Sequence, residues 1–340
     1  MGQPLAITAT GLVTSVGLTA PAACAAIRAG VTNPIETEYL DSSGESIIGH
    51  RVPLAMPWKG PIKHVKMAAS AIEEALGGLP RDEWPRIPLL LCVAERDRPG
   101  RFEGLDDELP LRLQQELNIR FSPQSATIAQ GRISAAVALQ QARTLIYDGN
   151  VPHVLIAAAD SLLNWPTLTE YERADRLLTA TNSNGFLPGE GAGALLVGKP
   201  SGDPELLCHG IGFGVERAEI GSSEPLRAEG LTIAIKAALA DAGCHLHDLD
   251  FRITDISGEQ YYFKEATIAL SRILRRRKEI FDMWHPAECI GEAGAVAGIA
   301  IVAVANAACR KSYAPSNNIL THVANDGGER AAAVFQFRAT

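Results

Sequence analysis

The pair of side chains with the most obvious reactivity is a cysteine and a histidine in the C-terminal part of the chain. Cys289 directly follows Glu288 and lies four residues after His285. A thiolate is a strong nucleophile, and a neighbouring imidazole can accept the thiol proton, so such a pair could take up an acyl group. We favour a buried cysteine beside a loop carboxylate, because the loop conformation, and not the spacing, sets where these side chains point.

The cysteines as a group do not have the spacing of a metal site. They lie at positions 24, 92, 208, 244, 289 and 309, without a Cys-x-x-Cys pair or a Cys/His cluster. Most stand among alanine or other apolar residues, which indicates buried, reduced thiols in a cytoplasmic protein without metal or cofactor. The first residues lack the charged and apolar segments of a secretory signal, so none is expected.

The elements that must position these residues alternate between strands and helices. Continuous apolar runs at 87–93, 152–159 and 190–197 predict strands that are covered on both faces. Segment 131–147 has the composition of a largely buried helix. Segment 292–309 is rich in Ala and Gly and too short to span a bilayer comfortably, so it also predicts a buried helix and no membrane span.

The pattern restarts in the second half of the chain. Ala71-Ile72-Glu73-Glu74-Ala75-Leu76 resembles Ala234-Ile235-Lys236-Ala237-Ala238-Leu239, and two small-residue helices begin near Gly131 and Gly291, at a similar interval. Similarities at one offset indicate an internal duplication. We therefore predict an α/β protein of two fused halves, residues 1–200 and 201–340, that form one compact unit.

Composition narrows the class of function. The chain has 340 residues, of which 46% are apolar, so it can bury a large core. Its formal net charge of -8 argues against a nucleic-acid-binding protein, which would normally be basic. The cations Arg272, Arg275, Arg276, Arg277 and Lys278 form one basic run. We expect them to complement a helix C-terminus, and docking of an acidic carrier protein is the alternative.

Several segments resemble, in the same order, motifs of β-ketoacyl-acyl carrier protein synthases. The most specific is Gly185-Phe186-Leu187-Pro188-Gly189-Glu190-Gly191-Ala192-Gly193, similar to the GF(V)xGEGAG signature of that family. Weaker matches lie at 7–14, 157–163, 291–298 and 325–331. The resemblance implies the thiolase fold, a duplicated five-layer α-β-α-β-α arrangement that normally forms a dimer. Within the signature, we expect Glu190 to be a structural hydrogen-bond acceptor.

The positions that match the family's catalytic residues carry other side chains. Condensing enzymes of this family use a cysteine thiolate at a helix N-terminus and two histidines. Here Gln130 stands for the cysteine, Ser257 for the first histidine and Glu288 for the second, while Asp326 replaces the gating phenylalanine. An amide is no nucleophile at neutral pH. The resemblance therefore implies a retained scaffold without catalytic residues.

Two further residues bear on this interpretation. A shift of one residue in the match would put Gly131 at the nucleophile position, which also supplies no thiol. Ser134 is the nearest hydroxyl, one helical turn further on, and we expect it to hydrogen-bond the backbone. His322 and Asp326 are candidates for the floor of the ancestral cavity.

Three functions remain open. The favoured one is a non-catalytic, ketosynthase-like adaptor or partner subunit, because chain length factors of aromatic polyketide synthases also carry Gln for Cys. The alternatives are a β-ketoacyl-acyl carrier protein synthase or acyltransferase with an altered active site in fatty-acid or polyketide biosynthesis, and a module that binds an acyl chain. The implied partners are a second copy of the chain, a related ketosynthase, or an acyl carrier protein. A secreted effector is a further possible partner, because the chain also resembles short members of this fold that lack the catalytic residues and are encoded beside bacterial secretion effectors.

Overall fold

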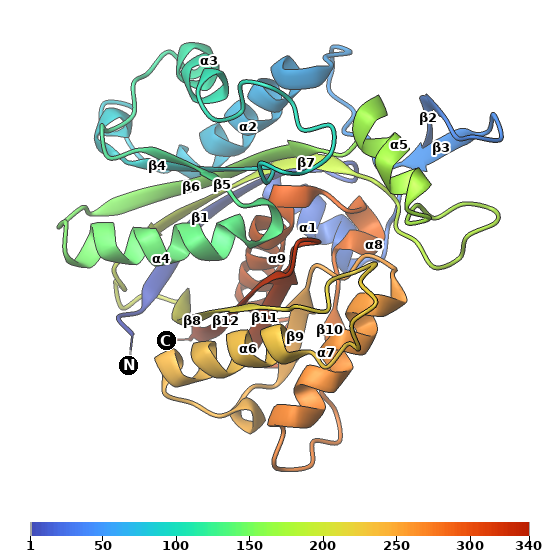
Figure 1. Cartoon of the computed structure of the whole chain (residues 1–340). Helices are drawn as coiled ribbons and strands as arrows, with labels where there is room; N and C mark the ends of the chain where they lie inside the picture. The colour runs from blue at the N-terminus through green and yellow to red at the C-terminus, as the bar shows by residue number, and fades with distance from the viewer. Residues whose placement is uncertain (1, 340) are drawn as a thin grey trace.

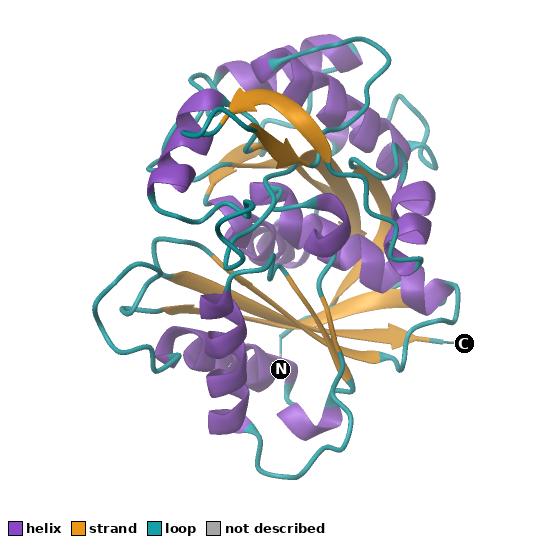
Figure 2. Cartoon of the chain, turned by 90° about the vertical axis from the view of Figure 1, so that its right-hand side faces the viewer, coloured by secondary structure: helices purple, strands orange, loops and turns teal. Residues whose placement is uncertain are grey.

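Five alternating layers of helices and strands make up the molecule. The computed structural model describes residues 2–339. Two layers of strands are separated by a central layer of helices, and further helices cover the outer face of each strand layer (Figure 1). Figure 2 shows the same separation from the side. The arrangement is the α-β-α-β-α order that the family resemblance implies.

The N-terminal layer of strands has both parallel and antiparallel neighbours. Its spatial order is β5 (Ala126–Ala129), β4 (Leu89–Val93), β6 (His153–Ser161), β7 (Glu190–Gly198) and β1 (Leu5–Val13). Strands β4, β5 and β6 run parallel, whereas β7 is antiparallel to both of its neighbours. Helices α2 (Gly60–Leu76) and α3 (Glu108–Leu117) cover the outer face, and α4 (Ser134–Tyr147) lies on the inner face (Figure 1).

The C-terminal layer repeats this plan. Its order is β10 (Met283–Trp284), β9 (Phe251–Thr254), β11 (Asn318–Ala324), β12 (Glu329–Arg338) and β8 (Glu205–Val215). Helices α6 (Glu229–Ala242) and α7 (Gln260–Ile273) lie outside, and α9 (Ala297–Arg310) lies in the central layer beside α1 (Ala20–Arg28). Counted along the chain, each layer has the order third, second, fourth, fifth, first. The two layers meet where β1 pairs with β8.

Small residues allow helices to approach the strands and each other. Gly210, Gly212 and Gly214 alternate along β8, and a Cβ on any of them would overlap the backbone of α6. In the central layer, a Cβ on Gly298 of α9 would lie 2.7 Å from Cβ of Ala135 in α4. The Ala- and Gly-rich composition of both central helices thus follows from their close packing.

The structure contains short elements that the sequence does not predict, and it shortens one predicted helix. The region 30–65 contains a hairpin of β2 (Ile35–Leu40) and β3 (Ser46–Gly49), and α5 (Trp165–Arg173) follows β6. The predicted helix 292–309 begins with a 3-10 turn, Gly294–Val296, and becomes α-helical only at Ala297. Polar or very short segments such as these carry little periodicity, which explains why pattern analysis does not find them.

The structure also bears on the expected membrane span, metal site and cysteines. Among residues 2–339, no helix has the length and apolar character needed to cross a membrane. The same residues contain no group of His, Cys, Asp and Glu side chains arranged to hold a metal ion. Five of the six cysteines are buried and Cys244 is partly exposed, and all six are free thiols, as the sequence suggests.

Candidate functional site

The start of α4 is the position at which the family resemblance expects a nucleophile. Strand β5 ends at Ala129, and a 3-10 turn, Gly131–Ile133, leads into the helix. Gln130 is exposed, and its backbone N–H donates to Ser134 Oγ at 3.1 Å. Ser134 Oγ in turn donates to the Ile128 carbonyl at 3.2 Å, as predicted. Neither side chain is therefore presented to the interior as a reacting group.

Gly131 leaves no room for a side chain. Its φ of 52° lies in the left-handed region, and a Cβ there would overlap Oε2 of Glu95. Glu95 follows β4, and burial raises the pKa of its carboxyl group. Gln130 or Gly131 matches the family cysteine. In either case, the carboxyl group of Glu95 lies beside this turn.

Arg132 is the residue of this turn that points inward, and it is only 7% exposed. Its guanidinium donates to Glu292 Oε2 at 3.1 Å, to the Tyr262 hydroxyl at 3.1 Å and to Asp326. Asp255 Oδ2 lies 3.9 Å from its Nε. A buried guanidinium is stable only with such partners, so the start of α4 carries a fully engaged cation.

Asp326 is the centre of this arrangement. It lies in the loop between β11 and β12 and accepts hydrogen bonds from Arg132, Arg176, Tyr171 and Tyr262. The two guanidiniums hold the pKa of its carboxyl group well below the usual range. Asp326 therefore stays ionised and ties together loops from both halves of the chain.

Arg176 completes what we call the central ion-pair network. The network comprises Arg132, Arg176, Asp255, Glu259, Glu292 and Asp326, with the phenols Tyr171 and Tyr262. Arg176 binds the Glu259 carboxylate with both prongs of its guanidinium, at 2.7 and 2.8 Å. Such bidentate pairing is the strongest form of this contact. The groups in contact here are guanidinium, carboxylate and phenol.

Glu292 differs from Asp326 in its protonation. Burial raises the pKa of its carboxyl group to about 7, even though Arg132 lies next to it. The physical reason is that Arg132 also faces Asp326 and Asp255, so its charge is shared among several carboxylates. Glu292 Oε1 also accepts from the Gly294 backbone N–H at 3.0 Å, at the turn that begins α9.

Ser257 and Glu288, which stand at the positions of the two family histidines, lie in different surroundings. Ser257 lies between β9 and α7, two residues before Glu259, and its buried hydroxyl has no hydrogen-bond partner in residues 2–339. Glu288 lies on the short helix α8 (Ala287–Ile290), where its side chain is 70% exposed and Oε1 lies 3.2 Å from His285 Nδ1. Asn325 Nδ2 donates to the Gln130 carbonyl at 3.0 Å. The structure thus brings Gln130 and Asp326 into one site, but not Glu288.

Cys289 and His285 line the same hollow, but no hydrogen bond joins them among the described residues. Cys289 Sγ lies 4.0 Å from the Ile27 carbonyl oxygen, and His285 packs edge-on against Phe263. Burial, helped by the charge of Glu288, raises the pKa of the Cys289 thiol. A raised pKa disfavours the thiolate, which agrees with the buried-cysteine interpretation.

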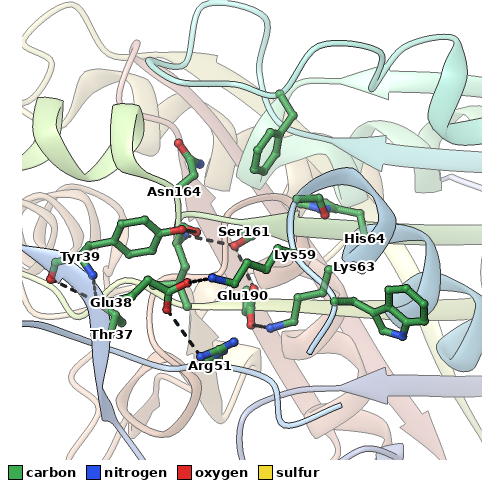
Figure 3. Close-up of a pocket in the computed structure, with 14 residues that line it drawn as sticks. Thr37, Glu38, Tyr39, Arg51, Lys59, Lys63, His64, Ser161, Asn164 and Glu190 are labelled. Atoms are coloured by element: carbon green, nitrogen blue, oxygen red, sulfur yellow. Dashed lines mark hydrogen bonds and ion pairs between the residues drawn. The ribbon is translucent and has the colours of Figure 1, made fainter. Parts of the chain in front are cut away.

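Glu190, from the family signature, lies at a separate polar pocket of about 130 Å³ (Figure 3). It accepts hydrogen bonds from the Val52 backbone N–H at 2.9 Å, from Ser161 Oγ at 3.0 Å and from the buried Lys63 ammonium. Glu190 thus accepts hydrogen bonds in the structure, as expected from the sequence. The ion pair between Lys63 and Glu190 joins α2 to β7 next to the β2–β3 hairpin.

Two other sequence candidates lie outside the network. His322 is buried in β11, where burial lowers its pKa to about 3. The basic run follows α7, which ends at Ile273, and Arg275 and Arg276 line a surface groove with Lys236 of α6. Docking of a carrier protein at this run stays a prediction.

Sequence reasoning misses most of the network. Arg132, Arg176, Glu259, Tyr262 and Glu292 come from distant segments, and only the fold brings them together. One signal was present. Arg132 stands among small and apolar residues at the start of a buried helix, so a carboxylate partner from elsewhere was required.

Among the comparisons with known proteins, the solved structures show the fold. No protein-family model and no curated protein matches the sequence. Solved structures do match: a ketosynthase (ApeO) in complex with its chain length factor (ApeC) from Xenorhabdus doucetiae has a TM-score of 0.77 at 14% identity, covering 99% of this chain and 98% of that one.

Two further matches cover both chains completely. The ishigamide ketosynthase/chain length factor has a TM-score of 0.80 at 16% identity, with 100% of each chain covered. A type II polyketide synthase acyl-carrier protein in complex with its ketosynthase bound to the hexaketide has a TM-score of 0.80 at 15% identity, again with 100% of each chain covered. The chain therefore has the thiolase fold of ketosynthases and chain length factors.

Proposed function

We propose that this protein is a non-catalytic, ketosynthase-like subunit that acts by binding a protein partner. The observation that carries the proposal is the Asp326 carboxylate, which is held between Arg132 and Arg176 at the start of α4. A condensing enzyme needs a thiolate at this place and imidazoles that face it. The central ion-pair network instead puts paired guanidinium and carboxylate groups at the start of α4.

The network also argues against use of the ancestral cavity for an acyl chain. An acyl group would have to displace side chains that are paired in a largely buried site. Removal of one partner from a buried ion pair costs about 3–5 kcal/mol, because the other charge stays behind unpaired. An apolar chain supplies no replacement for these hydrogen bonds, so the acyl-chain-binding alternative is disfavoured at this position.

The proposed partner is a related ketosynthase. Two of the similar structures combine a ketosynthase with a chain length factor, and a third contains an acyl-carrier protein. In this chain, β5 is the outermost strand of its layer and pairs only with β4 among the described strands. An edge strand offers free backbone groups to a second sheet, so β5 is the proposed contact, with a carrier protein as an additional partner.

Turnover measurements separate this proposal from an altered enzyme. We expect purified protein, incubated with malonyl- and acyl-carrier thioesters, to release carbon dioxide no faster than a sample without protein. Intact-mass spectrometry is expected to show no acyl adduct. An adduct on Cys289 that is lost in Cys289→Ala would support the altered acyltransferase instead.

Assembly provides the second test. Co-expression with a cysteine-bearing ketosynthase from the same genome, followed by native mass spectrometry, should give a heterodimer. Ala126 is an exposed residue of β5, so Ala126→Lys should weaken assembly by placing a charge on the paired edge. Ala237→Lys, on the exposed side of α6, is the matched control. Equal assembly by both variants would exclude β5 as the contact, and a monomeric protein in every mixture would contradict the proposal.

A further inference from the structure

A second hollow, separate from the central network, lies between the end of α1, β10, α8 and α9. Its volume is about 420 Å³, within the range of roughly 300–1,000 Å³ that is typical of small-molecule sites. Apolar groups from Ile27, Met283 and Val304 line it together with the aromatic rings of Trp284 and Tyr313. We call it the Trp284 pocket.

The Trp284 side of the pocket packs against the core. The rings of Trp284 and Tyr313 lie nearly parallel, with an interplanar angle of 20° and centroids 6.4 Å apart. Phe251, which is fully buried in β9, packs against Trp284 with a centroid distance of 4.9 Å. A wall that is already ordered loses little conformational freedom when a ligand binds, which favours binding of a flat or apolar group.

One cation at the mouth of this pocket is free. The Arg28 guanidinium, at the exposed end of α1, lies 4.2 Å from the centroid of the Tyr313 ring. Among residues 2–339, no carboxylate lies within ion-pair distance of it, whereas Glu288, the acid that lines the pocket, is next to His285. Stacking on an aromatic ring orients the guanidinium and leaves its N–H groups available for an anion.

We propose that the Trp284 pocket binds a small carboxylic acid with an apolar body. The carboxylate would pair with Arg28, and the body would lie against Trp284, Tyr313 and Val304. Planar carboxylate recognition by a guanidinium fork supplies the orientation, and the aromatic walls supply the apolar area. This inference stands independently of the partner role, because it uses no residue of the central ion-pair network or of β5.

The test compares a charged probe with a neutral probe of the same shape. We expect 2-naphthoate to bind with a dissociation constant at least tenfold below that of 2-naphthamide, measured by calorimetry and by quenching of tryptophan fluorescence. Arg28→Gln should remove that difference by weakening naphthoate binding about tenfold, since it loses a charge-assisted hydrogen bond. Arg96→Gln, at an exposed arginine of the N-terminal half, is the control and should bind as the unmodified protein does.

A second probe identifies the body of the ligand. Decanoate carries the same carboxylate on an aliphatic chain, so Arg28-dependent binding of decanoate in preference to naphthoate also supports the site and assigns it to aliphatic acids. Tyr313→Leu, at a partly exposed position, should weaken naphthoate more than decanoate. Binding of neither acid at millimolar concentration, or equal binding by the unmodified protein and Arg28→Gln, would overturn the proposal.

Discussion

The central ion-pair network and the Trp284 pocket use arginine in opposite ways. In the network, Arg132 is nearly buried and faces three carboxylates. At the pocket, Arg28 is exposed, stacks on Tyr313 and has no carboxylate beside it among residues 2–339. The first arginine is fixed by its neighbours, whereas the second remains available to a ligand.

This difference separates a centre whose charges are paired within the fold from a pocket whose arginine has no carboxylate partner among residues 2–339. Charges that satisfy one another inside a fold stabilise a particular arrangement of loops and offer nothing to a substrate. A cation supported by an aromatic ring is oriented without being neutralised. The proposed partner role and the proposed ligand site therefore rest on different arginines: one is paired inside the fold, and the other is exposed at a pocket.

The largest expected effect on this comparison comes from removal of Arg132, the cation that three carboxylates share. Arg132→Met should lower the free energy of unfolding by about 3–5 kcal/mol, because Asp326, Glu292 and Asp255 would remain together without their common partner. Urea denaturation followed by circular dichroism measures the change.

The matched control is Arg112→Met, which breaks an exposed pair with Glu108 one helical turn away. That change should lie within about 0.5 kcal/mol of zero. If the two variants lost similar stability, the network would be no more than a set of surface contacts.

Removal of the central carboxylate should have a smaller effect, of about 2–3 kcal/mol, and one that depends on pH. Asp326 has a folded-state pKa below its usual value, so its stabilising contribution is present above about pH 4 and is lost as the pH falls through the folded-state pKa. Unfolding of Asp326→Asn and of the unmodified protein should therefore converge in acid. A stability difference that stays constant from pH 7 to pH 3 would contradict the assignment of an ionised Asp326.

Glu292 should show the reverse dependence. Its pKa is raised from the usual value to about 7, so its contribution is fully present below about pH 4.5 and is lost as the pH rises through 7. Relative to Glu292→Gln, the unmodified protein should lose about 2 kcal/mol of stability between pH 5 and pH 8. Two-state urea titrations at both values measure this, and a difference that is independent of pH would show that Glu292 is ionised throughout.

The sequence predicts the outline of the fold but not the content of its centre. The apolar runs of β4, β6 and β7 and the repeated helix motifs are local patterns, and they indicate the duplicated α/β layers correctly. The absence of a thiol at Gln130 is equally visible from one segment. Arg176 and Glu259 lie 83 residues apart, and neither has a local partner, so their pairing depends on how α5 and α7 are placed.

The dependence on the fold also explains why the sequence match places Glu288, and not Glu292, at the position of the second histidine. A motif match fixes the position of Glu288 in the chain, but in the structure this residue lies on the short helix α8 with its side chain 70% exposed. Glu292, four residues later, takes the inward position beside Arg132. A linear match could not distinguish these two acids, because only the backbone path decides which of them is buried.

The smallest expected effect concerns the reactivity of the Trp284 pocket. Cys289 lies at its wall and is 5% exposed, and burial raises the pKa of its thiol. Iodoacetamide at pH 8 should therefore modify Cys289 more slowly than the partly exposed Cys244, and Cys289→Ala should leave naphthoate affinity within about twofold, because the proposed contacts are Arg28 and the aromatic rings. Peptide mass spectrometry gives the order of modification. Preferential labelling of Cys289, suppressed by naphthoate, would mean that the pocket presents a reactive thiol, and the contrast between a closed centre and a pocket that only binds would no longer hold.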